Sequence, residues 1–266
     1  MRLIGRDEVY AQLDALLGAG TPRSAGVVLI EGAVGCGRTE MLAHVAETAA
    51  RGGALVLRGA GSAHDRDLPY GVLRQLTAGL PADIVPAARQ GELSGAEFTR
   101  ALCVAAERGP VVVCVDDLHL IDAASLEGLL EVARTVRTAP VLLVLADMAQ
   151  EHVGSPLART EFLRHPGFTR VALGRLDTAG TAELATLLTG APTDPTTTAA
   201  LHAATGGNPL LLRALLSERT PMQMPAAAAR EATTAPAAAT TPATPPPDAA
   251  AATAAVPGTG APLTAA

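Results

Sequence analysis

Apolar residues along this chain occur in two patterns, short continuous runs and longer stretches with helical spacing. The runs have the length of buried strands and cover 26–31, 54–58, 111–115, 140–146 and 170–173. Stretches with an apolar residue every three or four positions predict helices over 7–17, 40–50, 95–108, 123–137 and 156–164, with a further helix beginning near Tyr70. Since strands that alternate with helices build layered folds, the pattern predicts an α/β domain with a mostly parallel sheet covered by helices on both faces.

The pattern changes beyond residue 175. Three helices are predicted over 178–188, 195–204 and 209–218, and the last two flank Gly206-Gly-Asn-Pro209, whose glycine and proline signals are typical of a helix–helix corner. From about residue 220 the chain is almost entirely Ala, Thr and Pro, a composition that cannot bury enough apolar surface to fold. We therefore predict a core over 1–175, a small helical lid over 176–219 and a disordered tail or linker over 220–266.

Glycines between the first strand and its helix form a phosphate-binding pattern. Gly32-Ala-Val-Gly-Cys-Gly-Arg-Thr39 fits G-x-x-x-x-G-K-[ST] except that arginine replaces lysine. In this pattern, glycines turn backbone N–H groups onto phosphate oxygens at the positive end of the following helix. The alternative is an ordinary glycine-rich turn. The motif predicts a P-loop NTPase with a three-layer sandwich, and a nucleotide held by Gly32, Gly35, Cys36, Gly37, Arg38 and Thr39.

A second motif follows the buried run 111–115. Asp116 and Asp117 end this strand, where a carboxylate is needed for a hydrated Mg²⁺ ion. We expect Asp116 to hold Mg²⁺ together with the Thr39 hydroxyl, and Asp117 to polarise the attacking water as the catalytic residue. The separation of 77 positions between Thr39 and Asp116 leaves room for two further βα units.

Charge and composition argue against several classes of function. The net charge is −6, all 20 basic residues are arginine, and no arginine run or aromatic platform is present, so direct nucleic-acid binding is not expected. The three cysteines lack metal-ligand spacing, and Cys36 reads as a small filler rather than a redox-sensitive thiol with a pKa lowered by the helix N-terminus. No apolar stretch approaches the ~20 residues that cross a bilayer, and no hydrophobic signal region opens the sequence, which predicts a cytoplasmic protein without a membrane segment.

Several motifs together resemble one family. The sequence is similar to the ATP-binding domain of the large LuxR-type transcriptional regulators of actinobacteria, which belong to the STAND class of P-loop ATPases, related to the AAA group. The similarity covers about residues 2–218. It is carried by Leu3-Ile-Gly-Arg-Asp-Glu8, the loop 32–39, Asp67-Leu-Pro-Tyr-Gly-Val-Leu-Arg-Gln-Leu76, Asp116-Asp-Leu-His119 and Thr205-Gly-Gly-Asn-Pro-Leu-Leu211.

The resemblance implies a switch set by bound ATP or ADP. It implies that Arg6 lies near the adenine and that the turn containing Pro209 reports on the nucleotide. Three departures favour slow or absent hydrolysis: Arg38 replaces lysine, Asp147 follows the strand where relatives usually carry a phosphate-sensing arginine, and Leu120 replaces an aromatic residue. Loss of a transition-state cation can cost ~10³ to 10⁵ in rate.

Arg38 leaves other functions open. The chain has no lysine anywhere, so a coding bias against lysine would account for the substitution, but a planar guanidinium does not reproduce the compact charge of an ammonium group. A degenerate P-loop scaffold that acts through protein contacts and a genuine ATPase that uses arginine are therefore both alternatives to a nucleotide switch. No segment resembles the family's long helical sensor region or its C-terminal helix-turn-helix. Two interpretations therefore stay open: the switch module alone, as an isolated or truncated form of a longer regulator, or a chain that acts through a protein partner or self-association.

Overall fold

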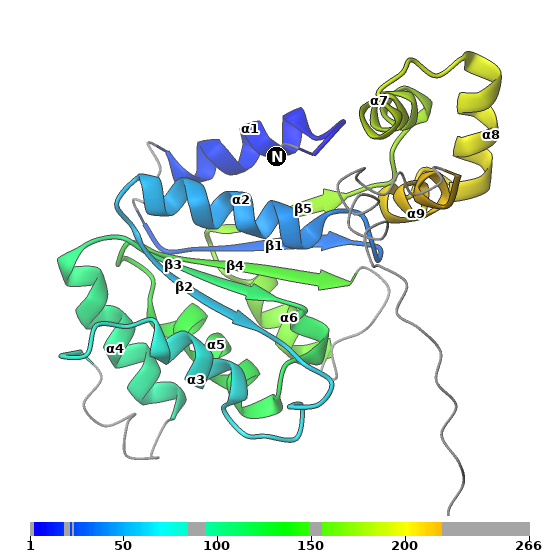
Figure 1. The fold of residues 1–266 in the computed structure, drawn as a ribbon. Helices are drawn as coiled ribbons and strands as arrows, with labels where there is room; N and C mark the ends of the chain where they lie inside the picture. Colours follow the sequence, from blue (N-terminus) through cyan, green and yellow to red (C-terminus); the bar gives the residue numbers. More distant parts are fainter. Residues whose placement is uncertain (1–2, 19–21, 23, 85–93, 149–155, 220–266) are drawn as a thin grey trace, which may run out of the picture. The chain divides into compact units, whose positions relative to one another are not determined.

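Five parallel strands form the central layer of the fold (Figure 1), in the order β2-β3-β4-β1-β5. All four strand pairs between them are parallel, as the alternation of strands and helices predicted. The computed structural model describes residues 3–18, 22, 24–84, 94–148 and 156–219, with the backbone alone at 156–159, 218 and 219. The strands are β1 (Gly26–Gly32), β2 (Leu55–Ala60), β3 (Val111–Asp116), β4 (Val141–Met148) and β5 (Phe168–Leu173).

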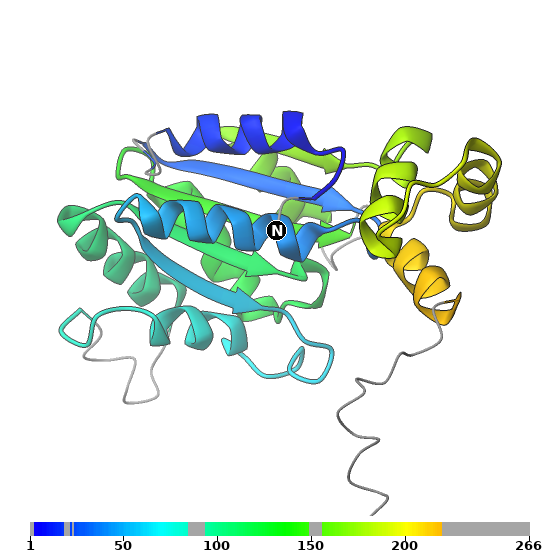
Figure 2. The same cartoon turned by 45° about the horizontal axis from the view of Figure 1, so that its top comes forward.

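Helices cover both faces of this sheet. Figure 1 shows α1 and α2 above the strands and α3 to α6 below them, and in Figure 2 α1 and α2 lie in front. This arrangement is the three-layer sandwich expected from the sequence. The helices are α1 (Asp7–Leu17), α2 (Arg38–Arg51), α3 (Gly71–Ala78), α4 (Gly95–Arg108), α5 (Ala123–Thr135) and α6 (Pro156–Leu163), with a short 3₁₀ helix, η2 (Leu118–Leu120), after β3.

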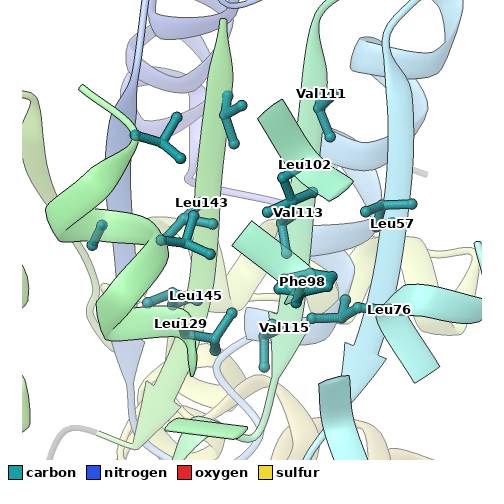
Figure 3. Close-up of a cluster of buried hydrophobic side chains, with 14 of the residues drawn as sticks. Leu57, Leu76, Phe98, Leu102, Val111, Val113, Val115, Leu129, Leu143 and Leu145 are labelled. Carbon is teal, nitrogen blue, oxygen red and sulfur yellow. The ribbon is translucent and has the colours of Figure 1, made fainter. Parts of the chain in front are cut away.

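The three central strands, β3, β4 and β1, are almost continuously apolar because both faces of the sheet are packed there. Every residue of β1 is buried, which explains its continuous apolar run. On the face of α3 to α5, Phe98 and Leu129 pack with Val113, Val115 and Leu143 (Figure 3). Fully burying side chains of this size stabilises a fold by ~1.5–3 kcal/mol each, so these contacts fix the positions of β3 and β4.

The carboxyl ends of all five strands lie at one edge of the sheet because the strands are parallel. At this edge the phosphate-binding motif follows β1, and Asp116 ends β3. β4 lies between these two strands, with Asp147 aligned to Glu31 of β1. The two motifs found in the sequence are therefore not on adjacent strands.

A group of three helices follows β5. It consists of α7 (Thr178–Thr189), α8 (Pro195–Thr205) and α9 (Pro209–Arg219). Their own apolar cluster contains Leu184, Leu201 and Leu212, and Ile4 from the start of the chain packs against it. Gly206 ends α8 with a left-handed backbone and Pro209 begins α9, which confirms the predicted corner and the helical lid.

The structure refines the expected elements. The predicted strands and helices are present, with ends that differ by only a few residues. Among the residues described between Thr39 and Asp116, one strand (β2) and two helices (α3 and α4) follow α2, and these are the elements that the apolar pattern predicted in an interval with room for two βα units. The predicted tail over 220–266 lies outside the described residues, and the domain boundaries at 175 and 219 stay predictions. No helix in the described ranges is long and apolar enough to cross a membrane.

Candidate functional site

The phosphate-binding loop joins β1 to α2 through glycines with unusual backbone angles. Gly35 and Gly37 have φ values of +76° and +100°, in the left-handed region that disfavours residues with a Cβ atom. A Cβ at Gly32 would collide with the Cys36 sulfur, and one at Gly35 would collide with Leu210 of α9. The glycines are therefore needed both for the turn and for the close packing beneath and above it.

Cys36 lies inside this loop as a buried thiol. Its residue is 3% exposed, and burial raises the pKa of the thiol even though the nearby Arg38 charge and backbone act to lower that pKa. The pKa of this thiol is therefore raised on balance, against the alternative of a redox-sensitive thiol with a lowered pKa. A protonated, enclosed thiol is the filler that the sequence favoured.

Arg38 is the first residue of α2 and folds back across the loop. Its Nη1 donates a 2.7 Å hydrogen bond to the Gly32 carbonyl, at the other end of the motif. Its Nη2 lies 3.5 Å from Oδ1 of Asp117, and only 10% of the arginine side chain is exposed. The guanidinium thus joins the loop after β1 to the acids after β3, and its charge already has a partner.

The Thr39 hydroxyl and the Asp116 carboxylate are brought together across 77 residues. Thr39 Oγ1 donates to Asp116 Oδ2 at 2.7 Å, and the Asp117 amide donates to Asp116 Oδ1 at 2.9 Å. Asp117 itself has a left-handed backbone with φ +46°, an uncommon state for a residue with a side chain. The loop hydroxyl and the first acid therefore lie as the sequence predicted, side by side at the sheet edge.

These oxygen atoms suit magnesium. Mg²⁺ prefers hard oxygen ligands, keeps several waters and needs only one or two groups from the protein. The Thr39 hydroxyl and the Asp116 carboxylate supply such a pair, so the residues present fit the ion. No group of three or more His, Cys, Asp or Glu side chains is arranged to hold a metal within the ranges described, which leaves this pair as the candidate position.

Arg6 and Pro209 lie at a small cavity beside the loop. With Cys36 and Leu176 they line a space of about 20 Å³, roughly the volume that one water needs. The Arg6 guanidinium donates to the Gly174 carbonyl, and burial lowers its pKa. The structure thus brings the two residues assigned to the adenine side and to the lid turn to one place, but a purine would have to move the surrounding side chains.

Sequence reasoning missed Asn208. Its Nδ2 donates a 2.9 Å hydrogen bond to the Val34 carbonyl in the phosphate-binding loop. Its Oδ1 accepts from the amides of Leu210 and Leu211, at 2.9 and 3.3 Å, and so caps the start of α9. The amide side chain was visible in the Gly-Asn-Pro turn, but its partner lies 174 residues earlier.

Sequence reasoning also left two further groups at this edge without a structural role. Asp147, noted only as a departure from the family, is buried at the end of β4, with His119 Nδ1 3.6 Å from its Oδ1. Glu31, the residue before the loop, is buried and accepts from Arg170 Nε of β5. The site is therefore rich in carboxylates, with Arg38, Arg170 and His119 facing them.

Comparison with known proteins adds a family and a fold. The family model described as AAA ATPase domain matches residues 2–144. An uncharacterised protein of Rhizobium meliloti (strain 1021) is 41% identical over 78 residues, which are 29% of this chain and 7% of that protein.

Two solved structures share the architecture. The AMPPCP-bound DnaA from Aquifex aeolicus matches with a TM-score of 0.54 and 14% identity, over 87% of this chain and 66% of that chain. The ORC1 protein of Aeropyrum pernix, in complex with DNA, matches with a TM-score of 0.53 and 18% identity, over 83% and 62%. This chain spans a small fraction of the curated relative and less than two thirds of these two structures, and identities this low show the fold alone.

Proposed function

The chain belongs to the AAA ATPase domain family, and from that premise we propose that it is a nucleotide-controlled switch module that binds ATP or ADP with Mg²⁺ and hydrolyses ATP slowly or not at all. A nucleotide-binding domain is what the family implies. The regulatory role and the relation to large LuxR-type regulators are the further step, and they rest on the motifs from Leu3 to Leu211.

The contact between the lid and the loop carries this proposal. The Asn208 side chain bonds the Val34 carbonyl within the phosphate-binding loop, and the same side chain caps α9. A change in the conformation of the loop when nucleotide binds is therefore transmitted by this side chain to the first turn of α9. A loop and a helix joined by one side chain form the kind of element whose two arrangements a ligand can bias.

The surroundings of Arg38 support slow hydrolysis. A catalytic cation has to be free to stabilise charge as it develops on the transferred phosphoryl group. Here the guanidinium is bonded to the Gly32 carbonyl and lies beside Asp117, the acid expected to polarise water. The Arg38 guanidinium and the Asp117 carboxylate would both have to leave their present partners during turnover. This arrangement favours a long-lived nucleotide-bound state over rapid hydrolysis.

In the Mg²⁺-bound state, the ion would be held by Thr39 and Asp116 and would neutralise phosphate charge. The chain's own groups then have separate tasks. The loop amides and the N-terminus of α2 bind the phosphates, and the Arg38 guanidinium contributes a second cation once it leaves the Gly32 carbonyl. Asp117 orients water, and Arg6 and Pro209 border the base.

One observation favours a second function. Arg38 is nearly buried and spans the mouth of the loop, so a chain in which this arrangement is permanent would be a protein-interaction scaffold without nucleotide. A genuine ATPase requires the opposite, an Arg38 that is readily released.

Calorimetric titration with ATP and ADP, with and without Mg²⁺, tests the proposal on the native chain and on Arg38→Lys. Arg51→Lys in the same helix is the control, because Arg51 donates hydrogen bonds to Glu47 and Thr48 on the exposed surface of that helix. Micromolar binding by the native chain supports the switch. Binding by Arg38→Lys alone assigns the scaffold, and rapid phosphate release that disappears in Asp117→Asn assigns the ATPase.

A further inference from the structure

One carboxylate at the loop has no role in the function proposed above. Asp147 is the penultimate residue of β4, and only 2% of its side chain is exposed. β4 pairs with β1 on one side and with β3 on the other, so Asp147 lies between the strand that leads into the loop and the strand that ends at Asp116.

The carboxyl end of β4 lies in the gap between the start of the loop after β1 and the acids after β3. This follows from the strand order, since β4 separates the two motifs. The Arg38 guanidinium already crosses this gap, from the Gly32 carbonyl to the neighbourhood of Asp117. Asp147 lies close enough to Arg38 for their charges to interact, and it is aligned with Glu31, the residue before the loop, so its residue lies among the strand ends that border this gap.

The surroundings of Asp147 hold its carboxylate in place but do not neutralise it fully. The Met148 amide donates to Oδ1 at 2.8 Å, the His119 backbone donates as well, and the His119 ring lies 3.6 Å away. The side chains that face it are the Arg38 guanidinium from α2 and the His119 imidazole from η2, while Glu31 of β1 is its neighbour in the sheet register. Burial outweighs these contacts and raises the pKa of the Asp147 carboxyl, so a negative charge here is already costly.

We propose that Asp147 makes this site prefer a nucleoside diphosphate to a triphosphate. The inference rests on the proposed function, because it requires that loop 32–39 binds a nucleotide. The diphosphate is held by the loop, whereas a third phosphate extends into the gap over β4. An additional negative charge there is repelled by the buried carboxylate or requires that Asp147 first take up a proton, and both lower the affinity for ATP relative to ADP.

The test compares dissociation constants for ADP and ATP, at matched Mg²⁺ concentration, in the native protein and in Asp147→Asn. Asparagine keeps an acceptor for the Met148 amide and removes the charge. We expect the native chain to bind ADP more tightly, and the variant to gain about tenfold in ATP affinity relative to ADP, a change of ~1.4 kcal/mol. Asp14→Asn is the control, since Asp14 forms a similar pair with a histidine, 3.0 Å from His44 of α2, and should leave the ratio unchanged.

The possible outcomes separate the two proposals. An unchanged ratio in a variant that still binds ADP overturns the role of Asp147 and leaves the nucleotide switch intact, and an equal loss of both affinities assigns Asp147 a merely structural role. Absence of binding by the native chain and by the variant removes the proposed function and this inference with it. If Asp147→Asn does not fold, the native protein decides, because tighter binding of ATP than of ADP contradicts the inference.

Discussion

Removing the Asp122 carboxylate should destabilise this protein more than the loss of an ordinary helix cap. Asp122 precedes α5 and is 3% exposed. Its Oδ1 accepts from the amides of Ser125 and Tyr70, both at 2.8 Å, and its Oδ2 accepts from the Val72 amide at 3.3 Å. One side chain therefore caps α5 and also holds the start of α3, where Tyr70 has a left-handed φ of +62°.

The expected magnitude follows from these contacts. Loss of the cap at Ser125 costs ~1 kcal/mol. The amides of Tyr70 and Val72 would lose their partner in a largely buried place, at ~1–3 kcal/mol each, with Val72 at the low end because its bond is long. The sum for Asp122→Ala is about 3–5 kcal/mol, a large share of the ~5–15 kcal/mol that stabilises a typical domain.

Urea unfolding of Asp122→Ala measures this loss as a decrease in the free energy of unfolding. Asp177→Ala is the matched control, because Asp177 caps α7 with a single bond from the Gly180 amide at 2.7 Å and should cost ~1 kcal/mol. Asp122→Asn, which keeps one acceptor oxygen, should fall between the two. Equal losses in Asp122→Ala and Asp177→Ala would refute the reasoning, because they would mean that the bonds to α3 contribute nothing.

Three further predictions concern the site and the core. Thr39→Ala should abolish the gain in ATP affinity on adding Mg²⁺, measured by titration, whereas Thr48→Ala on the same helix should retain it. Asn208→Asp keeps the cap of α9 but replaces the donor to Val34 with an oxygen. Amide hydrogen exchange at the start of α9 should therefore become several-fold faster, while the free energy of global unfolding changes by ~1 kcal/mol or less. An unchanged exchange rate would contradict the coupling of lid and loop. Burial raises the pKa of the Cys114 thiol from 9.0 to about 12, so the thiol of the unfolded chain loses its proton at a lower pH than that of the folded protein. The free energy of unfolding should therefore fall as pH rises above about 9. Urea unfolding at about pH 8 and about pH 10 measures this fall, which should be smaller in Cys114→Ala.

The elements were predictable because their signals are local. The run at β1 and the helical spacing of α4 each depend on residues within one element, and Ser94 and Glu97 form the capping box that begins α4. The loop was predictable for the same reason, since its glycines lie next to one another. Between Thr39 and Asp116, the apolar run 54–58 and the helical spacing near Tyr70 and over 95–108 likewise predicted the one strand and two helices that follow α2 in the described residues.

The roles assigned to the site residues rest on the motifs and stay predictions. What the structure adds is which groups meet. Thr39 bonds Asp116, as the paired motifs indicated, and Arg38 turns to the Gly32 carbonyl, which no local pattern specifies. The Cys36 thiol shows how packing reverses a local expectation, because burial outweighs the helix N-terminus.

The sequence by itself determined the order of strands and helices, the glycine loop and the two acids after β3, because periodicity, glycine spacing and charge are properties of neighbouring residues. Only the tertiary structure decided that β4, which follows β3 in the chain, is inserted between β3 and β1, and so brings Asp147 between the strand that leads into the loop and the strand that ends at Asp116. Strand order depends on how whole layers of the fold pack together. The Asn208–Val34 hydrogen bond likewise depends on tertiary structure, because it joins residues 174 positions apart. Contacts of this kind gain their stability from burial and hydrogen bonding across the fold, so no local pattern in the sequence encodes them.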